Sequence, residues 1–488
     1  MLKRDTSEYW ALVSVLIAFF GFFSVRVWDI DFWWHLAAGK YILESVSIPS
    51  VDPFGVYDAS SVWGQTVLKS QWLGQVMLYS IYRFFDIDGI ILFRAAILTA
   101  CLFTVYWRCR IAGTGAVFAL PLVALSGLAI LMHTGERPQL FSFLYCSLIF
   151  LLLDMYIISG RKWALYFVPL VMLLWSNTHG GAFLGEVALS LFGAGFIAEN
   201  TLREKHFSWS GNGPMLVVVA MGATALLLTP NGTTTFRYLV ELQNNPIRAQ
   251  TSEYASNWVL WPVTMYYWAF FGVAFISLYG LFNRAFIKQG MVVFIIGAIS
   301  MTGFRFIPFF VLISAPYVAA SLNRMLANIQ FPSRQMNALL FIVACVCLVI
   351  GVRQHRVFQF GIQEQRFPVG AANFIEANRL GGRTFTSMNW GGYLIWKLGD
   401  RVSVFVDGRL LDPGRIAPYT NILWTTPEGL QYFRQAGFDM VLVPPSNTFD
   451  AERYPLIAYL SEQPEWQAVY QDRESYLFVR KGLQAFPK

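Results

Sequence analysis

Charged residues are scarce in this sequence. Asp, Glu, Lys and Arg make up 13% of its 488 residues, whereas hydrophobic types make up 56%. A soluble domain carries charge on about a quarter of its residues, so this composition excludes an ordinary soluble protein and favours a polytopic helical membrane protein. The net charge of +7 contains no long basic run. We attribute it to cytoplasmic Lys and Arg and expect no nucleic-acid partner.

Cysteine is also scarce, and its positions exclude two kinds of site. The five cysteines all lie in or beside apolar runs, and none follows Cys347. The polar C-terminal region therefore cannot contain a disulfide. No CxxC pair or zinc-ligand spacing occurs in the chain, so a structural zinc site is not expected. The first apolar run lacks a small-residue cleavage site and is interpreted as a retained helix rather than a signal peptide.

Long apolar runs are abundant, and they predict about eleven transmembrane helices. Short loops rich in Lys and Arg recur on one side, together with Lys3 and Arg4. The positive-inside rule then places the N-terminus in the cytoplasm and the C-terminus outside. The runs lie near 10–25, 88–107, 113–132, 138–158, 163–177, 180–198, 213–229, 264–282, 288–303, 305–322 and 336–352.

This topology requires that residues 71–86 do not cross the membrane. The segment is amphipathic and suits a helix lying along the interface, as does 33–44. Two long outer loops result, at 27–87 and 230–262. We therefore expect a mostly α transmembrane domain over 1–352.

A change of composition near residue 365 predicts a second domain. Helix-like and strand-like segments alternate over 365–488, which indicates a small α/β domain outside the membrane. The expected helices lie at 369–379, 427–436 and 453–463, and the expected strands at 383–388, 402–406 and 439–443, with two more within 466–480.

The stretch from Trp28 to His35 places Asp29, Asp31 and His35 where the first helix should meet water. Tryptophans favour this interface, but carboxylates there are costly unless they have a function. One interpretation is an acidic stop signal after the helix. The other is an active site at the membrane surface, with Asp31 or Asp29 as general base or metal ligand and His35 in support.

The predicted topology places further polar residues on the same outer side. Singly, each could be a turn residue, a local ion pair such as Glu136–Arg137, or an arginine reaching lipid headgroups. Their concentration on one side favours a site. The set comprises His133, Glu136, Arg137, Asn177, His179, Glu253 and Arg305.

Transfer of a sugar from a polyprenyl phosphate would use such groups. A guanidinium binds phosphate bidentately, which suits Arg305 and Arg137. A carboxylate such as Asp31 would take the acceptor's proton. A divalent cation such as Mg²⁺ or Mn²⁺, where one is used, would take oxygen ligands from Asp31 or Glu253.

The acidic motif, the long first outer loop and the eleven runs resemble the GT-C glycosyltransferase superfamily over residues 1–352. Thr251-Ser252-Glu253 resembles the acceptor-loop motif of its oligosaccharyltransferase branch. Phe304-Arg305-Phe306 resembles that branch's late-helix arginine, which binds the donor phosphate.

Asn389-Trp390-Gly391-Gly392-Tyr393 resembles the WWDYG motif of the same branch. The resemblance implies that Trp390, Gly391, Gly392 and Tyr393 hold the acceptor together with Glu253. Two positions depart from the motif, since Asn389 replaces the first Trp and Gly391 replaces the Asp. No second-loop DxD motif is present either, so Glu136 or His133 would have to substitute for it.

The chain also resembles bacterial membrane proteins of unassigned function that share the patterns DxWWHL, RPQLF and GGYLIW. Near the third pattern, Asp407 and Arg409 follow an expected strand, either as a turn with a local ion pair or as site residues.

The sequence thus predicts a glycosyltransferase that moves a sugar or oligosaccharide from a polyprenyl-phosphate carrier to an acceptor. It would act at the outer face of the bacterial inner membrane, with the C-terminal domain in the periplasm. The acceptor could be a protein, a glycan or a lipid. Two other functions stay open: a lipid-linked sugar transporter or flippase, which would need charges within its spans, and a non-catalytic envelope assembly protein.

Overall fold

The structure is a computed structural model that describes residues 6–55, 61–244, 252–281, 286–446 and 452–483. Thr251 of the predicted acceptor-loop motif lies outside the described residues, as do Lys3 and Arg4 of the topology prediction.

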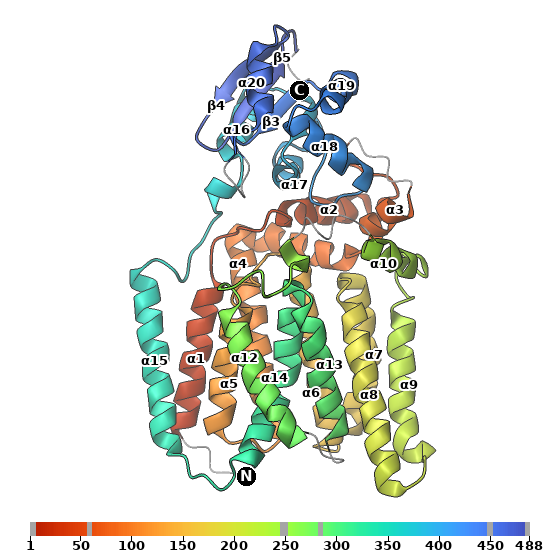
Figure 1. The fold of residues 1–488 in the computed structure, drawn as a ribbon, viewed down its shortest axis with the longest axis vertical. Coiled ribbons are helices and arrows are strands. Elements are labelled where there is room, and N and C mark those ends of the chain that lie inside the picture. The colour runs from red at the N-terminus through yellow and green to blue at the C-terminus, as the bar shows by residue number, and fades with distance from the viewer. Residues whose placement is uncertain (1–5, 56–60, 245–251, 282–285, 447–451, 484–488) are drawn as a thin grey trace. The chain divides into compact units, whose positions relative to one another are not determined.

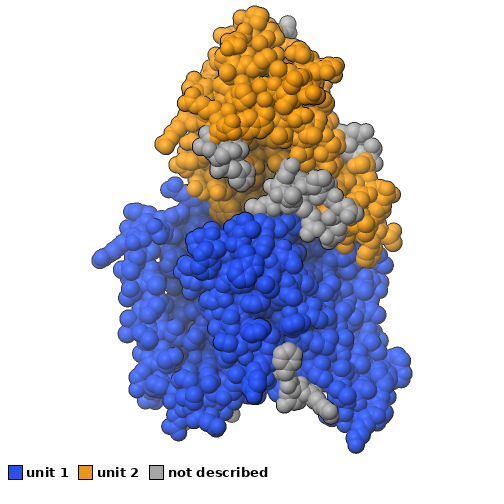
Figure 2. All heavy atoms as spheres, in the orientation of Figure 1, with its two compact units in different colours: residues 1–26, 85–232, 243–361 blue, residues 27–84, 233–242, 362–488 orange. Residues whose placement is uncertain are grey.

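The chain divides into two compact units, coloured separately in Figure 2. Unit 1 comprises 1–26, 85–232 and 243–361, and unit 2 comprises 27–84, 233–242 and 362–488. One change of unit follows residue 361, between the predicted domains 1–352 and 365–488, but both units are discontinuous in sequence, so the predicted domains stay predictions. The two predicted outer loops are divided between the units. Most of 27–87 and a short part of 230–262 group with the C-terminal region, because their side chains pack there.

Unit 1 is a bundle of long helices that run side by side (Figure 1). Each apolar run identified in the sequence forms one of these helices, which confirms the predicted mostly helical membrane fold. Their bounds are α1 (Thr6–Phe23), α4 (Trp72–Ile111), α5 (Ala116–Ile130), α6 (Gln139–Ile157), α7 (Lys162–Thr178), α8 (Ala182–Glu204), α9 (Trp209–Ala225), α12 (Met265–Leu281), α13 (Ile287–Met301), α14 (Ile307–Met325) and α15 (Ser333–Arg353); the short turns η1 (Ser252–Tyr254) and η2 (Phe304–Phe306) complete the unit.

Six helices within the described part of the chain are long and apolar enough to cross a membrane. Shorter apolar helices accompany them, among them α5, α12 and α13. The predicted number of eleven spans and their orientation stay predictions, because length and composition alone do not decide whether a short helix crosses.

Helix α4 contains a backbone break that the sequence analysis anticipated. The predicted interfacial segment 71–86 forms its first part, and at Asp86 the backbone leaves the helical region with φ 56° and ψ −162°. The carboxylate of Asp86 accepts the amide of Ile87 at 2.8 Å. The break separates this first part, which belongs to unit 2 through residue 84, from the apolar second part in unit 1.

Buried ion pairs hold the helices of unit 1 together. Arg94 of α4 pairs with Glu136 and also donates to the carbonyl of Phe23 at 2.9 Å. Arg108 binds Asp154 at 2.7 Å. A buried arginine is stabilised when carboxylates and carbonyls surround it. These charges therefore hold helices together and do not line a transport path for a substrate.

Unit 2 contains a five-stranded sheet of order β2-β1-β3-β5-β4. The first three strands are parallel, and β5 and β4 continue the sheet antiparallel. Each strand and helix predicted for the C-terminal region is present. The bounds in unit 2 are α2 (Phe32–Ser45), α3 (Val62–Lys69), α10 (Thr234–Asn244), η3 (Glu364–Arg366), α16 (Val369–Ala377), β1 (Gly382–Thr386), α17 (Met388–Leu398), η4 (Gly399–Arg401), β2 (Val402–Val404), η5 (Pro413–Arg415), α18 (Ile416–Leu423), α19 (Pro427–Ala436), β3 (Met440–Val443), α20 (Pro455–Glu462), β4 (Trp466–Gln471) and β5 (Tyr476–Arg480).

Helix α17 packs against α2 within unit 2. Gly392 allows this approach, and Gly391 allows a second one, to the segment after β2. A Cβ on Gly392 would lie 3.3 Å from the backbone nitrogen of Trp34, and one on Gly391 would lie 2.6 Å from the Cβ of Asp407. The helix therefore joins the acidic segment before α2 to the C-terminal sheet.

Candidate functional sites

The two aspartates of the opening motif occupy different environments in unit 2. Asp29 is buried, and its Oδ1 accepts the backbone N–H of Asp31 at 2.9 Å. This is a turn-forming hydrogen bond of the kind that Asp side chains favour. Asp31 is only half-buried and stands at the N-terminus of α2. Of the two side chains, Asp31 is the more exposed.

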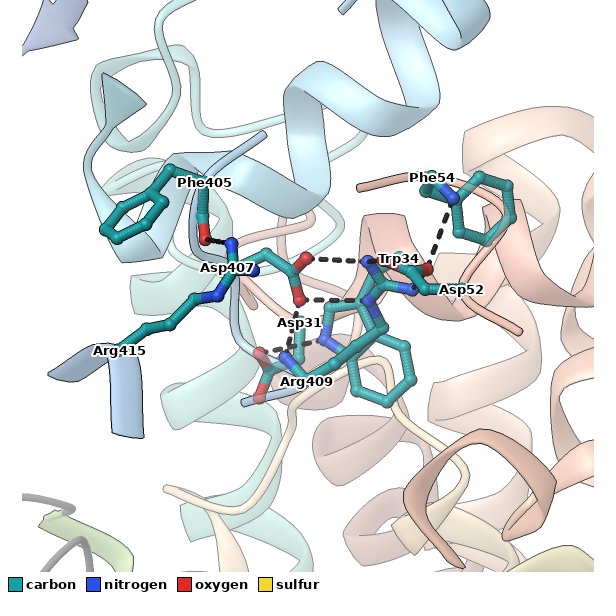
Figure 3. A network of polar contacts seen from close by, with 8 residues as sticks. All are labelled: Asp31, Trp34, Asp52, Phe54, Phe405, Asp407, Arg409 and Arg415. Carbon is teal, nitrogen blue, oxygen red and sulfur yellow. Dashed lines mark hydrogen bonds and ion pairs between the residues drawn. The ribbon is translucent and has the colours of Figure 1, made fainter. Parts of the chain in front are cut away.

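Two neighbours fix the carboxylate of Asp31. The indole Nε1–H of Trp34 donates to its Oδ1 at 3.0 Å. Gly408, in the turn after β2, lies so close that a Cβ there would collide with the same oxygen. The segment around Asp31 is thus seated against the C-terminal part of the same unit (Figure 3).

Arg409 is the centre of a buried ionic network beside this segment (Figure 3). Its guanidinium binds Asp407 through Nε at 3.0 Å and Nη2 at 2.7 Å. It binds Asp52 through Nη1 at 2.5 Å and Nη2 at 3.2 Å. Burial alone would lower the pKa of Arg409, but the two carboxylates outweigh it and raise the pKa. The turn therefore contains the local ion pair that the sequence suggested, extended by Asp52.

His35 is buried between α2 and the first part of α4. Gln75 donates to its Nδ1 at 3.4 Å, and its ring lies 3.5 Å from that of Trp34. These contacts give His35 a packing role; its predicted support of catalysis stays a prediction.

The WWDYG-like residues are buried in α17. The indole of Trp390 donates to the carbonyl of Arg366 at 3.1 Å, and the ring of Tyr393 stacks on Phe367. Gly391 and Gly392 are contact points, as described above. The structure accounts for all four by packing, and their predicted role in holding an acceptor stays a prediction.

A second cluster lies in unit 1, where η1 meets η2. Arg137 forms an ion pair with Glu253. Arg305 donates to the hydroxyl of Tyr254 at 2.5 Å, and its guanidinium lies 4.8 Å from the centre of that ring. The sequence-predicted residues Arg137, Glu253 and Arg305 are thus brought together from distant segments: Arg137 and Glu253 are 116 residues apart, and Arg305 and Tyr254 are 51 apart.

His133, in the turn after α5, binds the same cluster through Phe304 of η2. Its Nε2–H donates to the carbonyl of Phe304 at 3.0 Å, and its ring stacks on that of Phe304. The amide of Phe304 in turn donates to the carbonyl of Ala255 at 3.2 Å. These bonds hold η2, which carries Arg305, beside η1, which carries Glu253.

Two guanidiniums and one carboxylate give the cluster a net positive charge. Burial raises the pKa of Glu253, but the charges of Arg137 and Arg305 outweigh it and lower the pKa to about 2. Burial lowers the pKa of His133 to about 4, so this histidine is neutral near pH 7. The cluster of Arg137, His133, Glu253, Tyr254 and Arg305, here called the arginine cluster, is therefore suited to an anion.

The remaining predicted outer-side residues have separate positions. Glu136 is fully buried and pairs with Arg94, whereas Arg137 pairs with Glu253. The alternative of a local Glu136–Arg137 pair is not tested by these contacts. The side chain of Asn177 donates to the carbonyl of Leu173 in α7 at 3.0 Å and to that of Leu228, after α9, at 2.9 Å. His179 contacts Ser142 and has Arg137 and Arg305 as electrostatic neighbours.

A metal centre is not evident among the residues that the structure describes, because they contain no group of three His, Cys, Asp or Glu side chains. The two predicted ligands fall in different units, Asp31 in unit 2 and Glu253 in unit 1. Glu253 is already neutralised by Arg137. A divalent cation held by Asp31 or Glu253 stays a prediction.

Sequence reasoning missed Asp52, Ser142 and Tyr254. Tyr254 follows Glu253 directly and could have been included with it. Asp52 and Ser142 carry no local signal: their partners Arg409 and His179 lie 357 and 37 residues away, respectively.

Comparison with solved structures identifies the fold. The oligosaccharyltransferase of Archaeoglobus fulgidus, in complex with Zn and sulfate, matches with a TM-score of 0.58 at 10% identity, covering 89% of this chain and 68% of that one. ArnT from Cupriavidus metallidurans in the apo state matches with a TM-score of 0.60 at 11% identity, covering 99% and 100%.

The chain has the GT-C fold. A structure of the same ArnT bound to undecaprenyl phosphate also matches, with a TM-score of 0.55 at 12% identity over 98% of both chains. No family model and no curated protein sequence matches the chain. The likeness therefore establishes the GT-C fold, and the activity has to be argued from the sites.

Proposed function

We propose that the protein is a GT-C-type membrane glycosyltransferase that takes a sugar or oligosaccharide from a polyprenyl-phosphate carrier. One observation carries the proposal: on a GT-C fold, the arginine cluster gathers two guanidiniums, Arg137 and Arg305, around the single carboxylate of Glu253. Such a group binds an oxyanion through paired, charge-assisted hydrogen bonds. The undecaprenyl phosphate bound by the similarly folded ArnT supports this choice of anion.

The donor phosphate is the leaving group of the reaction. As the bond between the anomeric carbon and the phosphate oxygen breaks, negative charge grows on the phosphate. The guanidiniums of Arg137 and Arg305 stabilise that charge more strongly in the transition state than in the bound donor. Tyr254 limits the rotation of Arg305 through both its hydroxyl and its ring.

Asp31 is the proposed general base. The acceptor's O–H or N–H proton passes to its carboxylate while the acceptor atom bonds to the anomeric carbon. Trp34 holds Oδ1 of Asp31 by a hydrogen bond, which fixes the orientation of the carboxylate. This role is proposed for unit 2, and phosphate binding is proposed for unit 1.

The proposed location is the inner membrane of a bacterium, with the sites and the C-terminal domain on the periplasmic side. The short basic loops of the sequence motivate this orientation. Glu253 and residues 390–393 are proposed to contribute to acceptor binding, on the strength of their resemblance to the oligosaccharyltransferase branch. The acceptor itself, whether protein, glycan or lipid, stays open.

Transport of a lipid-linked sugar is the second candidate. A transporter would use ionisable groups inside its helices, and most such groups in unit 1 are paired with one another. Glu186 of α8 is different, because its Oε2 is buried without a hydrogen-bond partner in the described structure. This one carboxyl favours a transport function, whereas the arginine cluster favours transfer.

Binding of polyprenyl phosphate tests the proposal. Purified protein in detergent should bind undecaprenyl phosphate but not undecaprenol, as measured by quenching of intrinsic tryptophan fluorescence. The variant Arg305→Lys keeps the charge but loses the bidentate fork, and its affinity should fall about tenfold or more. Arg203→Lys, at an exposed arginine of the same unit, is the matched control and should bind normally. Equal affinity for Arg305→Lys and the wild type would remove the phosphate site.

A further inference from the structure

His179 lies in the turn between α7 and α8, outside both helices. Its Nδ1 contacts two groups: the backbone N–H of Gly181 at 2.9 Å and the hydroxyl of Ser142 at 2.7 Å. A backbone N–H can only donate a hydrogen bond. Nδ1 must therefore accept it, and so Nδ1 carries no proton.

The hydroxyl of Ser142 adds a second constraint. The indole of Trp175 donates to its oxygen at 2.7 Å, so the proton of Ser142 is directed away from Trp175 and toward Nδ1. Gly181 sits tightly in this arrangement, because a Cβ there would lie 2.6 Å from the Ser142 hydroxyl oxygen and 2.9 Å from Nδ1. Two donors thus point at one ring nitrogen.

A neutral imidazole has one proton, and with Nδ1 acting as acceptor that proton is on Nε2. Double protonation would set an Nδ1–H against the N–H of Gly181. Burial lowers the pKa of His179 to about 3, and the charges of Arg305 and Arg137 act in the same direction. His179 is therefore a neutral ring of fixed tautomer with Nε2–H as its remaining donor.

The charged residues of the arginine cluster act electrostatically on this histidine. Arg305, Arg137 and Glu253 are the charges that act on His179. Within the described chain, no hydrogen bond is seen from Nε2. A ring whose tautomer is fixed by Ser142 and Gly181, and on which two guanidiniums act electrostatically, suits an oxyanion, since its Nε2–H adds a hydrogen bond without adding charge.

We propose that His179 donates a hydrogen bond through Nε2–H to the phosphate group bound by Arg137 and Arg305, and that Ser142 and Gly181 fix its tautomer for this purpose. The inference rests on the proposed function, which it deepens by adding an uncharged donor to the phosphate site. It also gives the motif Asn177-Thr178-His179-Gly180-Gly181 a chemical meaning: the histidine supplies the donor and Gly181 supplies the amide that orients it.

Two substitutions separate binding from structure. In His179→Asn, the amide oxygen can replace Nδ1 as the acceptor, but no donor remains at the position of Nε2. In His179→Gln, the amide nitrogen reaches the position of Nε2, but the hydroxyl of Ser142 and the amide of Gly181 lose their acceptor. If His179 binds phosphate, His179→Asn should weaken binding of undecaprenyl phosphate about tenfold or more, and His179→Gln should stay within about threefold of the wild type. A purely structural role predicts the reverse order.

The tautomer has its own measurement. In protein labelled with ¹⁵N on histidine, the signals absent from His179→Gln identify this residue. The proposal expects one unprotonated Nδ1 and one protonated Nε2 from pH 6 to 8. A protonated Nδ1 overturns the proposal whatever the affinities of the two variants.

Three probes distinguish this inference from the proposed function. If wild type binds undecaprenyl phosphate and Arg305→Lys weakens it but His179→Asn does not, the role of His179 is wrong and the proposed function stands. If inorganic phosphate binds as tightly as the lipid with the same dependence on His179, the donor role stands and the lipid carrier is wrong. If neither undecaprenyl phosphate nor inorganic phosphate binds, or if undecaprenol binds as well as undecaprenyl phosphate, the role of His179 and the proposed function are both overturned.

Discussion

At the scale of single residues, the structure separates side chains that the sequence treats as equivalent. Asp29 and Asp31 form one motif, yet Asp29 is buried in a turn and Asp31 is half-buried at the start of α2. Glu136 and Arg137 are adjacent, yet Glu136 belongs to the buried pair with Arg94 and Arg137 to the arginine cluster. Local sequence could identify these residues as candidates but could not predict the ion-pair partners of Glu136 and Arg137, because those partners lie in distant segments of the chain.

Substitution of Asp31 tests the proposed base. Asp31→Asn keeps the acceptor oxygen for Trp34 but removes proton transfer, and loss of a general base costs about 10²–10⁴-fold in rate. The variant should fold, bind undecaprenyl phosphate normally and transfer almost no sugar from a donor-lipid extract.

Asp29→Asn is the matched control, because its side-chain oxygen can still accept a hydrogen bond from the amide of Asp31. Its transfer rate should fall less than that of Asp31→Asn. Turnover of Asp31→Asn within about threefold of wild type would return the motif to an acidic cap on the first helix.

At the scale of elements, patterning in the sequence was sufficient for most of the fold. Apolar runs marked every long helix of unit 1, and alternation of segments marked the sheet of unit 2. Helix α17 was missed because its two central glycines disfavour a helix and because tertiary packing against α2 and Asp407 is what favours it. The short helices α3 and α18 carry too few turns to give a periodic signal.

The Arg409 network is the element-scale feature whose removal should be most costly. Arg409→Met would leave the carboxylates of Asp52 and Asp407 buried without their cation, and breaking a buried pair in this way costs about 3–5 kcal/mol. Thermal unfolding in detergent should show a clear fall in the midpoint.

The control for Arg409 is an exposed pair in the same unit. Lys397 binds Glu376 at 3.0 Å with both side chains partly in solvent, and such pairs contribute about 0–1 kcal/mol. Lys397→Met should therefore unfold near the wild-type temperature. Similar thermal unfolding midpoints for Arg409→Met and Lys397→Met would show that the ion pairs of Arg409 do not stabilise unit 2.

At the scale of the whole molecule, composition predicted a helical membrane protein, and the fold agrees. The extent of each unit could not be predicted, because residues 27–84 and 233–242 join the C-terminal region through side-chain packing rather than chain order. The likeness to the oligosaccharyltransferase and to ArnT at 10–12% identity shows that very different sequences adopt this fold.

The orientation across the membrane is a prediction at this scale. Short basic loops place Lys162 in the cytoplasm and Ser403 outside. Single-cysteine variants at these positions, in a background without the native cysteines, should react differently with a membrane-impermeant reagent on intact cells: Ser403→Cys should be labelled and Lys162→Cys should not. The opposite pattern would place both sites on the wrong side for an extracytoplasmic donor.

Mass spectrometry of cellular lipids tests the central claim, that the protein removes sugar from a polyprenyl-phosphate carrier. Extracts from cells with the gene, without it, and with only the Asp31→Asn form should be compared for polyprenyl-phosphate-linked sugars. The account predicts that one such lipid accumulates in cells lacking the gene and in cells carrying Asp31→Asn, and that the wild-type gene restores its level. Unchanged amounts of every polyprenyl-phosphate-linked sugar in all three strains would contradict the account.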